Sequence, residues 1–139
     1  MAKVLISPGK YVQGAGEMKK LGEYAQNYGK KALILISKGG YKRIGAMVEK
    51  SFEGKECGYV FDYFNGECSK KEIKRLGEIV KKEACDVVIG IGGGKIFDTA
   101  KAVAYYEKTP VLICPTIAST DAPCSALSVI YTEEGLSLI

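Results

Sequence analysis

The stretch from Asp86 to Lys101 joins two local patterns that few folds can accommodate together. An uninterrupted apolar run, Val87 to Ile91, has the length and β-branched content of a strand that is buried on both faces, as in a parallel sheet. Gly92 to Gly94 end this run, and apolar residues then recur at helical spacing: Ile96, Phe97, Ala100, Val103 and Ala104. The stretch therefore predicts a buried strand, a tight glycine turn and a helix, which is the building unit of an α/β fold.

We expect the glycine turn to bind a phosphate group. Gly92 to Gly94 have no side chains, so a ligand can approach their backbone closely. The first N–H groups of the following helix lack internal partners and carry the positive end of the helix dipole, and Lys95 adds a full positive charge. The alternative is a tight turn that uses glycine only for its conformational freedom, although three glycines followed by a lysine exceed what such a turn requires.

Two commoner glycine motifs do not match this turn. A P-loop needs glycine where this chain has Ile89 and a hydroxyl side chain where it has Ile96, which argues against Walker-type ATPase chemistry. The dinucleotide fingerprint Gly-x-Gly-x-x-Gly fits Gly90 and Gly92 but meets Lys95 at its third glycine. A phosphate site at this turn must therefore use another glycine pattern.

Strand-like and helix-like segments alternate along the rest of the chain. Apolar strands are expected at residues 4–6, 32–36, 59–61 and 111–114, and the first of them is expected to close at Ser7-Pro8-Gly9. One helix is expected to end at Gly29, and a second to follow a loop over Ser37-Lys38-Gly39-Gly40. A third is expected to begin at Ser69, because Glu72 follows it at capping-box spacing. This alternation predicts a Rossmann-like, doubly wound parallel α/β sheet with ligands outside the carboxyl ends of its strands.

Composition restricts the classes of function. The 139 residues, 47% hydrophobic and 26% charged, are expected to form one domain, and a net charge of +4 spread over helix faces does not indicate a nucleic-acid partner. Five cysteines without a Cys-x-x-Cys pair, and no long apolar run, predict a cytoplasmic protein with no membrane partner. The cysteines are expected to pack as small hydrophobic side chains, Cys114 above all. The sequence contains no histidine, which excludes Ser/His and Cys/His catalysis within it.

The chain departs from this alternation after Cys114. Residues 114–124 carry two prolines and several polar side chains directly after a buried strand, where functional loops usually lie. Ala126 to Tyr131 is expected to form a strand, and Leu136 to Ile139 the second arm of a terminal β-hairpin. Because a domain rarely ends on an unpartnered apolar arm, we expect a truncated chain or the first part of a larger protein. Apolar surface left exposed there predicts a homo-oligomer.

Three segments make the chain similar to the glycerol dehydrogenases of the iron-containing alcohol dehydrogenase superfamily, whose fold is shared with dehydroquinate synthase. The segments are Ile6–Gly14, Gly92–Lys101 and Pro115–Tyr131, and the last is highly specific. The resemblance extends to about Gly135 and covers the nucleotide-binding half of such an enzyme, without the helical metal-binding domain. For the complete enzyme, it implies a metal-dependent transfer of hydride from glycerol to NAD, which converts glycerol to dihydroxyacetone. For this chain alone, it implies no such activity.

The resemblance also implies roles for individual residues. It places the pyrophosphate on Gly93, Gly94 and Lys95, with Asp98 just beyond on the helix. It assigns the adenosine and nicotinamide parts to Thr116, Ser119, Thr120, Ser125, Leu127 and Tyr131. Asp121 matches the residue that binds the hydroxyls of glycerol or a similar small polyol. The ligands of the divalent metal, zinc or iron, are one aspartate and two histidines in the half outside this chain.

Ser37 and Lys38 depart from the family pattern. Glycerol dehydrogenases often carry an aspartate after the second strand, where it pairs with the adenosine ribose hydroxyls and repels the 2′-phosphate of NADP. This chain has Ser37 there, followed by a cation. NAD is therefore the expected cofactor, with weaker discrimination against NADP than in relatives that carry the aspartate.

Other interpretations stay open at the level of the sequence. A stand-alone dinucleotide-binding module, or a related alcohol or polyol-phosphate dehydrogenase of the same superfamily, would carry the same glycine turn. A receiver or flavodoxin-like domain is disfavoured by residues 115–131. From the residues alone, Asp98 could also be a first-turn carboxylate favoured by the helix dipole, and Asp121 could cap a turn.

Overall fold

The computed structural model describes residues 8–13, 20–115 and 126–130, which form one sheet flanked by helices. The strands are β1 (Pro8–Gln13), β2 (Lys31–Ile36), β3 (Gly58–Tyr63), β4 (Val87–Gly92), β5 (Val111–Pro115) and β6 (Ala126–Ile130). Their order is β1-β6-β5-β4-β2-β3. The four strands β5, β4, β2 and β3 are parallel, whereas β6 is antiparallel to both β5 and β1. The predicted parallel sheet is confirmed, with an antiparallel pair at one edge.

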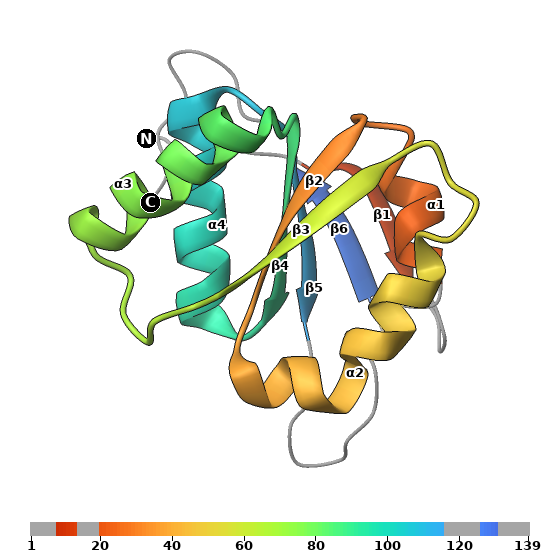
Figure 1. The fold of residues 1–139 in the computed structure, drawn as a ribbon, viewed down its shortest axis with the longest axis horizontal. Helices are drawn as coiled ribbons and strands as arrows, with labels where there is room; N and C mark the ends of the chain where they lie inside the picture. The colour runs from red at the N-terminus through yellow and green to blue at the C-terminus, as the bar shows by residue number, and fades with distance from the viewer. Residues whose placement is uncertain (1–7, 14–19, 116–125, 131–139) are drawn as a thin grey trace.

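Helices cover both faces of this sheet. They are α1 (Leu21–Ala25), α2 (Lys38–Ser51), α3 (Lys70–Glu83) and α4 (Gly94–Glu107). Successive side chains of a strand point to opposite faces, so Ile34 belongs to the core under α1 and α2, while Leu33 belongs to the core under α3 and α4. Figure 1 shows the two helix pairs on opposite sides of the sheet. The doubly wound arrangement is therefore confirmed.

The chain leaves two neighbouring strands, β2 and β4, toward opposite faces of the sheet. α2 follows β2 onto the face that also carries α1, and α4 follows β4 onto the face that carries α3. The register pairs Ile36 with Ile91, so the two strands end within one residue of each other and both helices begin at the same edge (Figure 1). Open α/β sheets bind their ligands at such a switch point, outside the carboxyl ends of the strands.

The first strand that the structure describes begins where the sequence predicted a strand to close. Residues 4–6 lie outside the described residues, and Pro8, which was expected to close a strand, begins β1 instead. A proline is tolerated there because it is the first residue of a strand at the edge of the sheet. At the other end of the described chain, β6 confirms a strand after Ala126, while the expected hairpin arm at residues 136–139 lies outside the described residues.

α1 is shorter than the sequence predicted, because it ends at Ala25 rather than at Gly29. The carboxylate of Asp86 accepts hydrogen bonds from the N–H groups of Lys30 and Lys31, at 2.8 and 2.9 Å from its Oδ1. A side chain on Gly29 would collide with this carboxylate. The helix therefore gives way to a turn that brings the chain past Asp86 into β2.

Candidate functional site

The glycine turn between β4 and α4 contains glycines that packing requires. Gly92 is the last residue of β4 and has φ +145°, a conformation that favours glycine. A Cβ atom there would lie 2.7 Å from Cδ1 of Ile96, and one on Gly90 would lie 3.0 Å from Cβ of Ala100. These two glycines let the first turns of α4 pack closely against β4.

Gly93 and Gly94 are different, because no packing contact requires them. A Cβ atom on either residue would have no other atom within 4 Å among the described residues. Gly93 is the N-cap of α4 and provides no side-chain hydrogen bond, although its carbonyl accepts the N–H of Phe97 at 3.0 Å. Among the described residues, the space that side chains at these two positions would fill is therefore open, beside the N–H groups of the first helical turn. Open N–H groups at the positive end of a helix dipole are suited to an anion.

The other two long helices have serine caps. Ser37 accepts the N–H of Gly40 at 2.9 Å, and Ser69 accepts the N–H of Glu72 at 3.1 Å. Both are side-chain hydrogen bonds of the usual N-cap kind. Among the 14-residue helices of the described chain, α4 is thus the one whose N-cap residue leaves the first turn unsatisfied.

The structure places the charged residues of the turn on the first two turns of α4. Lys95 is exposed, and its Nζ lies 3.4 Å from Oε2 of Glu67, a residue of the loop between β3 and α3. Asp98 is also exposed, but it is the fifth residue of the helix. The alternative interpretation of Asp98 as a first-turn carboxylate is therefore wrong, because α4 begins at Gly94 and Asp98 falls in its second turn.

Ser37 lies at the carboxyl end of β2, beside the end of β4. It is half-buried, and Lys38 after it is exposed, with its Nζ 5.9 Å from the centre of the Tyr63 ring. The expected loop over Ser37–Gly40 is wrong, since α2 begins at Lys38 and its first turn contains Gly39 and Gly40. Ser37 can cap the helix so early because its extended backbone, φ −79° and ψ 161°, directs its hydroxyl at the Gly40 N–H.

Most residues of the last predicted segment lie outside the described residues: Thr116, Ser119, Thr120, Asp121, Ser125 and Tyr131. Leu127 lies on β6, where its Cα is opposite Val12 of β1. The backbone of Pro115 pairs with Gly92, so the chain enters this segment directly beside the glycine turn. The structure thus brings together Ser37, the glycine turn and Pro115.

A buried carboxylate near this edge was not predicted from the sequence. Glu72 is only 1% exposed and accepts hydrogen bonds from Nε and Nη2 of Arg75, at 2.8 and 2.7 Å. The Arg75 guanidinium lowers the pKa of this carboxyl, whereas burial opposes that shift. The capping-box spacing located Glu72, but its side chain accepts the N–H of Asn65 at 3.3 Å instead of returning to Ser69.

The thiols divide into two groups. Cys57, Cys85 and Cys114 are buried, as predicted for small hydrophobic side chains, and burial raises the pKa of Cys57 and Cys85 to about 11. Cys68 is exposed, so the prediction is wrong for this residue, which lies in the loop before α3 and not in a strand. Cys124 lies outside the described residues.

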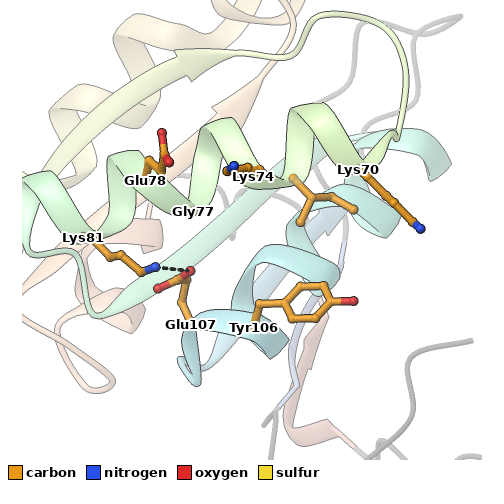
Figure 2. A pocket seen from close by; sticks show the side chains of 8 residues that line it. Lys70, Lys74, Gly77, Glu78, Lys81, Tyr106 and Glu107 are labelled. Carbon is orange, nitrogen blue, oxygen red and sulfur yellow. Dashed lines mark ion pairs between the residues drawn. The ribbon is translucent and has the colours of Figure 1, made fainter.

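Two hollows on the surface of the described residues lie away from this edge of the sheet. One of about 340 Å³ lies between α3 and the last turn of α4; Figure 2 shows Lys81 and Glu107 paired across it, with Nζ and Oε2 3.9 Å apart. Another, of about 520 Å³, lies beside α1 and α2 and is lined by Met47. None of the predicted site residues lines either hollow. The candidate site is therefore defined by the switch point of the sheet and the uncapped N-terminus of α4.

Among the described residues there is neither a cluster of metal ligands nor a membrane-spanning helix. No group of three or more histidine, cysteine, aspartate and glutamate side chains could hold a metal ion in that part of the chain. No helix formed by residues 20–115 is long and apolar enough to cross a membrane.

Comparison with known proteins identifies related sequences along almost the whole chain. The family model described as iron-containing alcohol dehydrogenase matches residues 8–138. A glycerol dehydrogenase of Escherichia coli is 50% identical over 137 residues, and one of Thermotoga maritima is 52% identical over 142 residues. Each alignment covers 97% of this chain but only 37% and 36% of the relative. The chain thus spans little more than a third of the length of these curated relatives.

Solved structures give the same result for the fold. A probable glycerol dehydrogenase from Sinorhizobium meliloti superposes with a TM-score of 0.70 at 41% identity, covering 88% of this chain and 33% of that one. An NADH-dependent butanol dehydrogenase from Thermotoga maritima superposes with a TM-score of 0.62 at 32% identity, covering 75% of this chain and 27% of that one. In both cases the superposed region is a third or less of the length of the solved protein.

Proposed function

The chain belongs to the iron-containing alcohol dehydrogenase family, a family of oxidoreductases, and we propose that it is the nucleotide-binding part of an NAD-dependent glycerol dehydrogenase. In this proposal residues 1–139 form one dinucleotide-binding domain, and the complete enzyme oxidises glycerol to dihydroxyacetone. The names of the relatives at about 50% identity support glycerol, or a similar small polyol, as the substrate. A cytoplasmic location and a homo-oligomeric assembly are part of the same proposal.

The observation that carries the proposal is the open N-terminus of α4 at the switch point of the sheet. A dinucleotide has two phosphates, and Gly93 and Gly94 leave space where side chains would otherwise stand. The N–H groups of the first turn would donate hydrogen bonds to the pyrophosphate oxygens, and Lys95 would add a charge beside them. The described residues therefore fit the phosphate part of NAD.

The neighbouring residues would hold the rest of the cofactor. Ser37, at the end of the adjacent strand, would contact the adenosine ribose, and Asp98 lies one turn farther along α4. By family resemblance, Thr116, Ser119, Thr120, Ser125, Leu127 and Tyr131 would hold the adenosine and nicotinamide parts, and Asp121 would bind the substrate hydroxyls. When bound, NAD supplies the acceptor for the hydride that leaves the alcohol carbon.

We assign no residue of this chain to the family's metal. Histidine does not occur in the sequence, and the part of the chain that the structure describes holds no cluster of metal ligands. The described residues therefore do not fit a metal site. We propose that the 139-residue chain, assayed by itself, does not oxidise glycerol.

Replacing Gly93 by valine tests the pyrophosphate site. The new side chain would meet no atom of the described protein, so the chain should fold, but it would stand where a phosphate is proposed to lie. Calorimetry should show that Gly93→Val loses measurable binding of NAD. Gly58→Val is the matched control, because a Cβ on Gly58, at the amino end of β3, has its nearest neighbour at 3.9 Å. Binding of NAD by Gly93→Val at the parent's affinity would contradict the proposal.

A further inference from the structure

A carboxylate lies beside the cation of the proposed phosphate site. Oε2 of Glu67 is 3.4 Å from Nζ of Lys95, and the two residues are 28 positions apart in the sequence. Their side chains are 75% and 66% exposed. Such an exposed pair contributes little to folding stability. Its consequence is instead local: the negative charge partly neutralises the cation that a phosphate would approach.

Glu67 is held in this position by its own turn. Its N–H donates to Oδ1 of Asn65 at 3.1 Å, which is an Asx turn, and Gly66 between them has φ +106°. The N–H of Asn65 in turn donates to the buried carboxylate of Glu72 at 3.3 Å. The backbone that carries Glu67 is thereby tied to the first turn of α3.

Arg75 extends this attachment to the sheet. Its guanidinium contacts Glu72 and also Oδ1 of Asp62 on β3, at 2.9 Å from Nη1. The same side chain donates to the carbonyl oxygen of Tyr63 at 3.3 Å. The loop of Glu67 is therefore fixed to both β3 and α3, while Lys95 is fixed on α4. The two charges meet because three packed elements place them together.

We propose that Glu67 is an internal competitor for Lys95, which weakens dinucleotide binding at this site. The inference rests on the proposed function, because it requires that the pyrophosphate binds at the N-terminus of α4. A pyrophosphate that approaches Lys95 must displace the carboxylate or share the ammonium group with it. Glu67 is therefore an affinity-determining residue outside the glycine motif, and it makes bound nucleotide easier to release.

Calorimetric titration of the full chain with NAD tests this inference. Glu67→Gln removes the charge and keeps the shape, and it should lower the dissociation constant about two- to fivefold at low ionic strength. The gain should largely disappear at about 1 M salt, where the screening length falls to roughly 3 Å. Glu78→Gln is the matched control, because it changes the net charge by the same amount. Glu78 is an exposed residue of α3 that lines the hollow in Figure 2, so its replacement should leave the affinity for NAD unchanged.

A double-mutant cycle separates the ion pair from a general change in charge. In a Lys95→Gln background, Glu67→Gln should improve binding far less than it does in the parent. Three outcomes would overturn the inference and leave the proposed function intact. They are an equal gain in affinity in both backgrounds, a gain of the same size in Glu78→Gln, and unchanged or weaker binding of NAD by Glu67→Gln. If the parent chain binds no NAD, the proposed function itself fails, so the two failures are distinguishable.

Discussion

Ser37 and Gly93 occupy equivalent positions at the ends of adjacent strands, but only Ser37 caps its helix with a side chain. Its hydroxyl accepts the N–H of Gly40 at 2.9 Å, whereas Gly93 provides no such bond to α4. Because β2 and β4 end within one residue of each other, a helix N-terminus with a side-chain cap and one without lie side by side at the switch point. In the proposed function, the pyrophosphate would bind at the uncapped end beside Gly93 and the ribose beside Ser37.

We expect Ser37→Asp to shift cofactor preference toward NAD. Aspartate is as good an N-cap as serine, so α2 should keep its cap, while the new carboxylate can accept from ribose hydroxyls and repel a 2′-phosphate. The ratio of the NADP and NAD dissociation constants should rise by the equivalent of roughly 1–2 kcal/mol. Ser37→Asn is the control, because it caps without a charge and should shift the ratio much less. An unchanged ratio in Ser37→Asp would refute the assignment of Ser37 to the ribose.

Two neighbouring glycines should respond to alanine with opposite signs. Gly92→Ala places a Cβ at φ +145° and 2.7 Å from Cδ1 of Ile96, so the free energy of unfolding should fall by about 1–3 kcal/mol. Gly94→Ala meets open space within a helix, so that free energy should stay equal or rise by up to about 1 kcal/mol. Urea denaturation of the two variants and the parent measures both changes. Equal destabilisation by both would show that Gly94 is also needed for packing.

The local parts of this architecture could be predicted from the sequence. The β4 segment is apolar without interruption because both of its faces are covered, and the glycines after it mark the turn into α4. Ser69 was predicted as a cap from its spacing to Glu72, and it accepts that residue's N–H. Each of these features depends on residues close together in the chain.

The features that the sequence did not predict depend on contacts between distant residues. Residues Ala126 to Tyr131 were predicted as a strand, but the place of β6 between β1 and β5 is set by pairing with segments far along the chain. The pair of Glu67 with Lys95 arises only when the β3–α3 loop and α4 meet at one edge. The burial of Glu72 was not predicted either: Arg75, which compensates it, is only three residues farther along α3, but the contacts of Arg75 with Asp62 and the Tyr63 carbonyl require that α3 packs beside β3.

Glu72 should make stability depend on pH in the acid range. Arg75 lowers the pKa of its carboxyl in the folded chain, so the ionised form contributes stability above the unfolded pKa of about 4.3, and this contribution is lost as pH falls through the lower folded value. Glu72→Gln should therefore lower the free energy of unfolding by about 1–3 kcal/mol at neutral pH, and the difference from the parent should shrink below about pH 4. Urea unfolding of the variant and the parent across this pH range measures the difference in their free energies of unfolding.

Glu83→Gln provides the control for that experiment. Glu83 also pairs with a cation, since its Oε1 lies 2.9 Å from Nζ of Lys31, but both side chains are 37% exposed. Solvent screens such a pair, so the variant should differ little from the parent at any pH. A pH-independent deficit in Glu72→Gln would mean that lost packing, and not the charge, causes the destabilisation.

Cys68 should react with alkylating reagents before the buried thiols do. It is exposed, whereas Cys57, Cys85 and Cys114 are 3%, 7% and 1% exposed. Burial also raises the pKa of Cys57 and Cys85 to about 11, so at pH 8 only about one molecule in a thousand carries either thiolate. Brief treatment of the native chain with iodoacetamide, followed by peptide mass spectrometry, should find Cys68 modified and these three protected until urea is added. Labelling of Cys57 or Cys85 at the rate of Cys68 in the native chain would show that the amino ends of β3 and β4 open to solvent under native conditions.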